Sequence, residues 1–229
     1  MRALPVVLGP KGLSWGAYPP LSIVWPCALD VSAYLALGRQ VEVGEHACPG
    51  CGRQLGGWGG YWRWLRGPGT QRLWIRRARC SSCRRSHALL PDFVLERRLD
   101  EVEVIGRALV LSVVIGLGMR NVADQVGVPM TTARDWRRRF RLRAPVLTAA
   151  IVAFAVHLDP AAVLLEGDDE TVAVQALGAA WQRARRRFGE RIAGLWRFWS
   201  LISGGQALGT NRSPPATWRL GAGWMAPSP

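Results

Sequence analysis

The chain has 229 residues and a formal net charge of +14, and 49% of its residues are hydrophobic. That hydrophobic content suffices for one or two compact domains and excludes a wholly disordered chain. Lys11 is the only lysine, so the positive charge is almost entirely arginine, which suits bidentate contacts to phosphate and guanine. The composition indicates a polyanionic partner, although a coding bias towards arginine would produce the same imbalance.

The N-terminal residues carry no pattern typical of export. The apolar run Ala3–Leu8 ends at Gly9 and Pro10, which is too short for the hydrophobic part of a signal peptide. A second apolar stretch, residues 146–156, falls short of the roughly 20 residues that cross about 30 Å of hydrocarbon and predicts a buried helix. We therefore expect a cytoplasmic, nucleoid-associated protein without a membrane partner.

Local patterns predict the following elements in chain order. Residues 1–20 are rich in Gly and Pro and indicate a loop; a strand over 21–25, a helix over 30–37 and a strand over 40–43 follow. Residues 48–83, dense in Gly, Trp and Arg, predict short strands, and an apolar stripe from Leu95 to Leu109 predicts a helix after Pro91. A long helix over Thr171–Ile202 precedes a Gly- and Pro-rich tail.

Four of the five cysteines form two C-x-x-C pairs separated by residues 52–79, which is the spacing of a zinc ribbon. Each pair directs two thiolates at one ion, and Gly50 and Gly52 permit the tight turn that this needs. The predicted ligands of one structural Zn²⁺ per chain are Cys48, Cys51, Cys80 and Cys83. A closed shell of four thiolates leaves no open position for catalysis. A redox pair or disulfides are weaker alternatives, because they need a different fold context or an oxidising compartment.

Three further residues near this region are not expected to bind the metal ion. His46 and His87 flank the cysteines and are expected to donate to the ligands or lie on the surface, and Cys27 is expected to be a small buried apolar side chain.

Residues 47–90 contain no acidic side chain but nine arginines, interleaved with Trp58, Tyr61, Trp62, Trp64 and Trp74. Arginines and aromatics together can hold a phosphate backbone and stack on bases, yet tryptophans also pack the thin core of a small domain. We expect nucleic-acid contact from the arginines and packing from the aromatics.

Residues 119–140 match the spacing of a helix-turn-helix. Val122, Val126, Ala133 and Trp136 fall where two helices bury against each other, and Gly127 falls in the turn. Residues 109–117 would supply a supporting helix, and Pro129 would start the second helix of the motif. Residues 130–143 hold six arginines against one acid, Asp135, which favours DNA binding over a solvated face.

The second helix of this motif carries the expected DNA contacts. The candidates for base edges are Met130, Thr131, Arg134, Asp135 and Arg138. The candidates for phosphate contact are Thr132, Arg137, Arg139 and Arg141.

The segments Cys-Pro-Gly-Cys-Gly, Arg-Cys-Ser-Ser-Cys-Arg-Arg, Ala-Leu-Leu-Pro and Val-Ala-Asp-Gln-Val-Gly-Val-Pro resemble the N-terminal regions of insertion-sequence transposases. The layout also resembles an actinobacterial family of zinc-ribbon plus helix-turn-helix proteins. The resemblance covers about residues 45–140 and implies that the cysteines bind zinc and that Thr131–Arg138 reads the ends of an element. Those transposases continue into a nuclease core with three carboxylates, whereas only about 85 residues follow here. Asp159, Glu166, Asp168, Asp169 and Glu170 are close in sequence and are interpreted as a solvated helix boundary.

Together these patterns predict an α+β fold with a small four-cysteine zinc ribbon, a helix-turn-helix and a mainly helical C-terminal region. The expected segments are an N-terminal strand and helix (1–44), the ribbon (45–91), the helix-turn-helix (92–143), a helical region (144–202) and the tail (203–229). The expected function is non-enzymatic, sequence-specific binding of double-stranded DNA, by a monomer or a homodimer, as a regulator or a transposase-derived protein. Two alternatives stay open: an accessory or truncated transposase acting with a nuclease partner, and an RNA-binding protein led by the ribbon.

Overall fold

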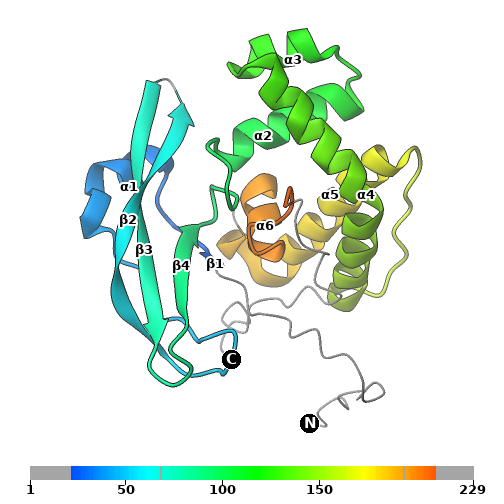
Figure 1. Ribbon diagram of the computed structural model, residues 1–229. Helices are drawn as coiled ribbons and strands as arrows, with labels where there is room; N and C mark the ends of the chain where they lie inside the picture. Colours follow the sequence, from blue (N-terminus) through cyan, green and yellow to red (C-terminus); the bar gives the residue numbers. More distant parts are fainter. Residues whose placement is uncertain (1–21, 68, 193, 210–229) are drawn as a thin grey trace, which may run out of the picture.

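The computed structural model describes residues 22–67, 69–192 and 194–209. A four-stranded sheet lies on one side of the molecule, and most of the helices lie on the other (Figure 1). The α+β class predicted from the sequence is therefore confirmed. The predicted N-terminal loop over 1–20 and the part of the tail from residue 210 lie outside the described residues.

The sheet is built around one long hairpin. β2 (Leu55–Gly67) pairs antiparallel with β3 (Gly69–Cys80), and β3 pairs antiparallel with β4 (Ser86–Pro91). β1 (Ser22–Trp25) pairs in parallel with β4, which gives the order β1-β4-β3-β2. The strand predicted over 21–25 is thus confirmed from Ser22, whereas β2 and β3 are much longer than the predicted short strands.

Helix α1 (Val31–Leu37) follows β1 and begins as the sequence predicted. The Asp30 carboxylate accepts a hydrogen bond from the Ala33 N–H at 2.7 Å and so caps the first turn. The strand predicted over 40–43 is wrong, because Gly38 ends α1 with φ +49 and leads into a 3-10 turn, η1 (Gly38–Gln40).

The helical region begins two turns later than the apolar stripe predicted. α2 (Val102–Leu109) starts at Val102, since residues 92–101 form turns in which Arg97 takes φ +59. Leu95 is buried all the same, but Leu99 is exposed. α2 continues into a π-helical turn, η2 (Val110–Val114), which stands where the supporting helix over 109–117 was predicted.

The remaining helices differ from the prediction in two places: one predicted boundary lies inside a helix, and one predicted helix is interrupted. α3 (Met119–Val126) and α4 (Met130–Leu158) follow η2, and α4 passes through Pro145, so the boundary predicted between residues 143 and 144 falls inside it. The single helix predicted over 171–202 is instead α5 (Asp169–Phe188), the 3-10 turn η3 (Gly189–Arg191) and α6 (Leu195–Ile202). Gly189 ends α5 because it takes φ +68, where other residues are strained.

Two apolar cores hold these layers. Tyr34, Leu73, Ile75 and Phe93 lie in the core beside the sheet, and the Tyr34 and Phe93 rings meet edge to face at 5.2 Å. A larger core joins the helices, with the Phe140 ring of α4 against Trp199 of α6. The helical core fixes the start of α4, and the sheet core fixes the middle of the hairpin through Leu65, Leu73 and Ile75.

Candidate functional site

The four predicted ligands converge at one end of the sheet. The Sγ atoms of Cys48, Cys51, Cys80 and Cys83 all lie within 4.8 Å of one another, and the Cys48–Cys83 and Cys51–Cys80 pairs are 3.5 and 3.4 Å apart. Cys48 and Cys51 precede β2, while Cys80 ends β3. The pairing of Leu55 with Cys80 in the hairpin brings the two turns together. This cluster could hold a metal ion.

The two cysteine turns have matching backbones. The N–H of Cys48 donates to the Arg53 carbonyl at 2.7 Å, and the N–H of Cys80 donates to the Arg85 carbonyl at 2.9 Å. Gly52 takes φ +73 in the first turn, and Arg84 takes φ +58 at the equivalent place in the second. The Cys83 N–H donates to the Cys80 Sγ and lowers the pKa of that thiol, while the backbone of Arg85 lowers the pKa of the Cys83 thiol less than burial and the neighbouring sulfurs raise it. Within the second turn, Cys80 is therefore the sulfur that ionises first.

The flanking residues lie as follows. His87 is buried, with its Nε2 3.8 Å from the Cys48 Sγ, which suits a donor to the ligand sulfur. Burial lowers the pKa of His46, so this ring is held neutral. Cys27 is buried beside the sheet, in the place expected of a small apolar side chain.

The aromatics of the hairpin do not pack as predicted. Trp58 and Trp64 are 53% and 54% exposed, and Tyr61 and Trp62 of the same strand are also exposed. Only Trp74 of this group is more covered, by the Trp62 ring at 5.1 Å and the Arg39 guanidinium at 4.8 Å. The apolar side of the hairpin is filled instead by Leu65, Leu73 and Ile75. We name as the aromatic–arginine surface the face of the hairpin that carries Trp62 and Trp64 together with Arg39 and Arg72. The register of the hairpin places Tyr61 and Trp58, with Arg79 over the Trp58 ring, on the opposite face.

Helices α3 and α4 meet across a short turn at the end of the molecule beyond α2 (Figure 1). Gly127 ends α3 in the left-handed conformation, with φ +70, as the sequence predicted for the turn. Val122 and Ala123 of α3 and Ala133 and Trp136 of α4 are buried against each other and α2. Pro129 precedes the first residue of α4 and does not form part of it.

The predicted DNA contacts divide between exposed and engaged side chains. Thr131, Arg134, Arg138 and Arg141 are exposed and share one side of α4, opposite the buried Trp136 and Phe140. Met130 is half-buried, with its Sδ 3.8 Å from an Arg134 nitrogen, and Thr132 accepts a hydrogen bond from Arg66 at 3.4 Å.

The carboxylate of Asp135 is bound by arginines, so few of its acceptor positions remain for a DNA base. Its carboxylate accepts from Arg138 at 2.8 Å and Arg139 at 2.5 Å and lies 3.7 Å from Arg98. Partial burial raises the pKa of Asp135, but these hydrogen bonds outweigh burial and hold the pKa below its usual value. Arg137 and Arg141 similarly reach Glu170 of α5, at 3.4 and 3.0 Å.

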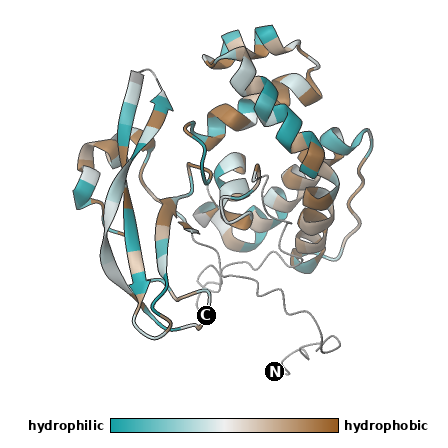
Figure 2. Ribbon diagram, viewed as in Figure 1, coloured by the Kyte–Doolittle hydropathy of each residue, from teal (hydrophilic) through white to brown (hydrophobic). Residues whose placement is uncertain are grey.

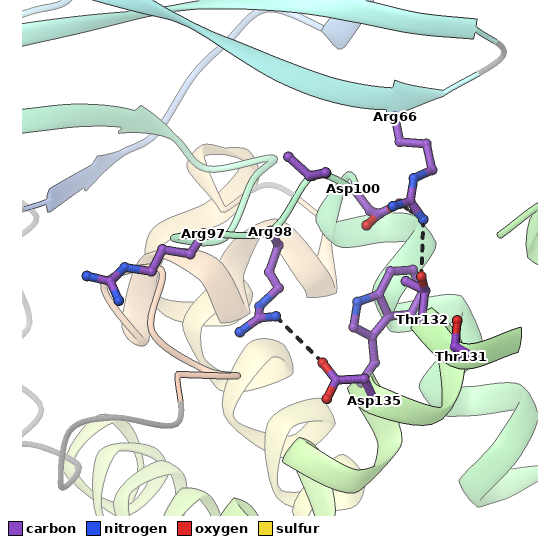
Figure 3. A pocket seen from close by; sticks show the side chains of 9 residues that line it. Arg66, Arg97, Arg98, Asp100, Thr131, Thr132 and Asp135 are labelled. Atoms are coloured by element: carbon purple, nitrogen blue, oxygen red, sulfur yellow. Dashed lines mark hydrogen bonds and ion pairs between the residues drawn. The ribbon is translucent and has the colours of Figure 1, made fainter. Parts of the chain in front are cut away.

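A pocket of about 310 Å³ lies between the hairpin and the start of α4. Arg66 points from the end of β2 to Thr132, and Arg98 points to Asp135 (Figure 3). Arg97 extends from the same rim and is 68% exposed. Sequence reasoning missed this arginine cluster, because it placed residues 95–99 on a helix. The signal that could have found it is the pair Arg97-Arg98, which Leu99 separates from the acid Asp100.

The second half of α4 is buried on one side only. Leu147, Ile151 and Ala155 are buried, but an exposed apolar stripe runs along the other side, comprising Leu142, Val146, Ala149, Ala153 and Val156. Figure 2 shows the same helix passing from hydrophilic near its start to hydrophobic towards its end. By length and composition alone, α4 is the one helix among the described residues that could cross a membrane. The helix predicted to be buried over 146–156 is therefore buried on one side only, and it is apolar on its exposed side as well.

The acidic residues before α5 do not form one solvated group. Asp168 caps α5 by accepting from the Thr171 N–H at 2.8 Å, as a helix boundary requires, and Asp169 and Glu166 are exposed. Glu170, by contrast, is only 5% exposed and binds the two α4 arginines, which corrects its assignment to a solvated boundary. Asp159 is bound by Arg183 and Arg186 instead of facing the others.

Comparison with known proteins gives a match to one family model. The family model described as a domain of unknown function (DUF6431) matches residues 48–118, a range that takes in the four cysteines, the hairpin and α2 and ends before α3. No curated protein and no solved structure matches the chain.

Proposed function

We propose that the protein binds double-stranded DNA at specific sequences, with α3 and α4 as a helix-turn-helix and the start of α4 in the major groove. The observation that carries this proposal is the exposed side of α4. Arg134 and Arg138 lie one turn apart, next to Thr131, on a helix whose opposite side is fixed in the core. A guanidinium so placed suits the O6 and N7 acceptors of guanine.

The arginines around this side of α4 suit the phosphate backbone. Arg141 continues the exposed side, and Arg97 and Arg66 stand at the pocket beside the first turn of α4. Contacts of this kind would orient the protein on a duplex without reading its sequence. Arg137 and Arg139 pair with Glu170 and Asp135 and are only 29% and 18% exposed, which favours a role in positioning α4 over the phosphate contact predicted for both. Arg141 and Arg138 pair with the same two carboxylates but keep 63% and 61% of their side chains exposed.

We propose that the metal is one structural Zn²⁺ per chain. Four thiolates are a ligand set typical of structural zinc, and tetrahedral bonds of about 2.3 Å would place sulfurs about 3.8 Å apart. Separations of 3.4 and 3.5 Å within a cluster that spans 4.8 Å need only small shifts to reach that geometry. The ion would join the two turns and so hold the base of the hairpin.

The biological setting that we propose is a cytoplasmic, non-enzymatic regulator or transposase-derived protein, in line with the motifs that resemble transposase N-terminal regions. An accessory or truncated transposase working with a nuclease partner is the alternative with the same DNA contacts. RNA binding led by the hairpin is favoured by the exposed aromatics, which a purely architectural ribbon does not need.

We further propose that two copies of the chain pair along the exposed apolar stripe of α4. Its members recur at steps of four and three residues, the heptad spacing with which helices pair, and the stripe continues the side of α4 that carries Arg134 and Arg138. The double change Leu142→Glu and Val156→Glu is expected to convert a dimer into a monomer in sedimentation equilibrium. Ile115→Glu, at a site equally exposed but off the stripe, should leave the dimer intact. A wild-type protein that sediments as a monomer at micromolar concentration would contradict this pairing.

The test of DNA reading separates base contacts from phosphate contacts. Arg134→Ala and Arg138→Ala are each expected to lower affinity for a selected duplex by about 1 to 3 kcal/mol and to relax base preference. Arg97→Ala and Arg141→Ala should weaken binding to every duplex alike, since a lost phosphate contact makes the slope of log affinity against log salt shallower by about one. Titrations on selected and scrambled duplexes at several salt concentrations measure both effects.

The matched control is Arg187→Ala, which removes the same charge from an exposed site at the end of α5. It should change neither affinity nor salt slope by more than a small fraction of these values. Unchanged affinity and base preference in Arg134→Ala and Arg138→Ala, with loss of binding in hairpin variants, would contradict the role of α4 as the reading helix.

A further inference from the structure

The proposed DNA contacts of α4 leave the aromatic–arginine surface unexplained. Trp62 and Trp64 are exposed by 36% and 54%, although tryptophan is costly to leave in water. They stand on β2, the strand at the edge of the sheet. Exposed aromatic patches of this kind mark binding surfaces in soluble proteins.

Arginines lie between and over these rings. The Arg72 guanidinium carbon lies 5.4 Å from the Trp62 ring centroid and 5.5 Å from that of Trp64. Arg72 pairs with Trp64 across the two strands, so guanidinium and indole groups alternate on the face that carries Trp62 and Trp64. Arg79 stands 4.6 Å from the Trp58 ring on the opposite face of the hairpin.

We propose that the aromatic–arginine surface binds unpaired bases of a single-stranded nucleic acid, which stack on the exposed indoles while the arginines contact the phosphates. Trp62 and Trp64 are two residues apart in one strand, a separation of about 6.8 Å. This is about twice the 3.4 Å step between stacked bases, so one planar group fits between the rings, where the Arg72 guanidinium now lies.

The positive charge of the surface favours a nucleic-acid strand as the ligand. Residues 47–90 contain no acidic side chain, so the surface attracts a polyanion along its whole length. Stacking on indole is available to every base only when the base is unpaired, because in a duplex the base faces are already covered. The surface therefore suits a single strand better than the intact duplex that α4 would read.

This site does not rest on the proposed function of α4, but it lies beside it. Arg66 at the end of β2 donates to Thr132 in the first turn of α4, so the hairpin and the reading helix are in contact. A strand opened next to a bound duplex site would lie within reach of the hairpin.

The experiment uses the full chain and fluorescently labelled 12-nucleotide oligomers of thymidine and of uridine, followed by anisotropy. Trp62→Ala and Trp64→Ala are each expected to lower affinity for the oligomers by about 5- to 100-fold, and Trp64→Phe should restore most of the loss because it keeps an aromatic face. Ile115→Ala, which truncates another exposed apolar side chain away from the hairpin, should stay within twofold. Tighter binding of the thymidine oligomer identifies DNA as the source of the strand, and tighter binding of the uridine oligomer identifies RNA.

The outcomes separate this site from that of α4. Arg134→Ala should lose a selected duplex and keep the oligomers, while Trp64→Ala should do the reverse, with metal content and circular dichroism unchanged in both. Oligomer binding that is absent in the wild-type protein, or that survives in Trp62→Ala and Trp64→Ala, would overturn the proposal whatever happens to duplex binding.

Discussion

Replacing Cys80 with serine is expected to abolish metal binding and to unfold the four-cysteine end of the sheet. Cys80 is fully buried at the end of β3, and its sulfur lies 3.4 Å from that of Cys51. In small zinc units the free energy of metal binding, about 10 to 16 kcal/mol, is also free energy of folding, because the site does not exist in the unfolded chain. The apolar core beside the sheet includes Leu73, Ile75 and Tyr34 but no residue of the two cysteine turns, so it does not replace the ion.

The measurement is elemental analysis of freshly reduced protein together with hydrogen exchange. The wild-type protein should contain one zinc per chain, and Cys80→Ser or a chelator should raise exchange over residues 46–56 and 79–87 while α2–α6 stay protected. Cys27→Ala is the matched control, since Cys27 is a buried cysteine outside the cluster and should keep the full metal content. Metal-free wild-type protein with the same protection in these turns would contradict the structural role of the ion.

Replacing Gly106 with alanine is expected to destabilise the helical region by about 3 kcal/mol, at the upper end of the usual cost of overpacking. A Cβ at Gly106 of α2 would lie 2.0 Å from the Trp196 Cδ2, far inside contact distance. The indole is buried and packs edge to face on Trp199 at 5.6 Å, so it can yield only by displacing its neighbours in the core. The gain of about 1 kcal/mol in helix propensity is too small to offset this clash.

The measurement is the midpoint of thermal unfolding, which should fall by roughly 6 to 12 °C for a chain of this size. Gly178→Ala is the control, because it lies inside α5 and a Cβ there would meet no described atom within 4 Å. That change should raise the midpoint slightly, through helix propensity alone. If both substitutions stabilise the protein, α6 does not pack on α2 as described.

The sequence predicted the local features that depend on few residues. The C-x-x-C spacing identified all four clustered cysteines, Asp30 marked the start of α1, and Gly127 marked the turn between α3 and α4. In each instance a single side chain or glycine conformation decides the structure, so neighbours in the sequence are enough. The exposed position of Arg134 and Arg138 likewise follows from helical periodicity, once Trp136 is taken as buried.

The features that depend on distant contacts were not predictable in this way. Leu95 lies on an apolar stripe of helical spacing, yet the chain around it turns, because the Arg66 N–H at the end of β2 donates to the Leu99 carbonyl. Glu170 looks like a solvated acid in the sequence, and only the approach of α5 to α4 gives it two arginine partners. The tryptophans of β2 look like core residues, but Leu65 and Leu73 fill that place.

Selection of bound sequences from a pool of random duplex DNA tests most directly whether α4 reads a specific DNA sequence. The wild-type protein is expected to enrich one motif that contains guanines, arranged as an inverted repeat if two copies bind together, and the double variant Arg134→Ala, Arg138→Ala should lose the preference at those guanines. Recovery of unrelated sequences by the wild-type protein, or of the same motif by the double variant, would contradict sequence reading by α4.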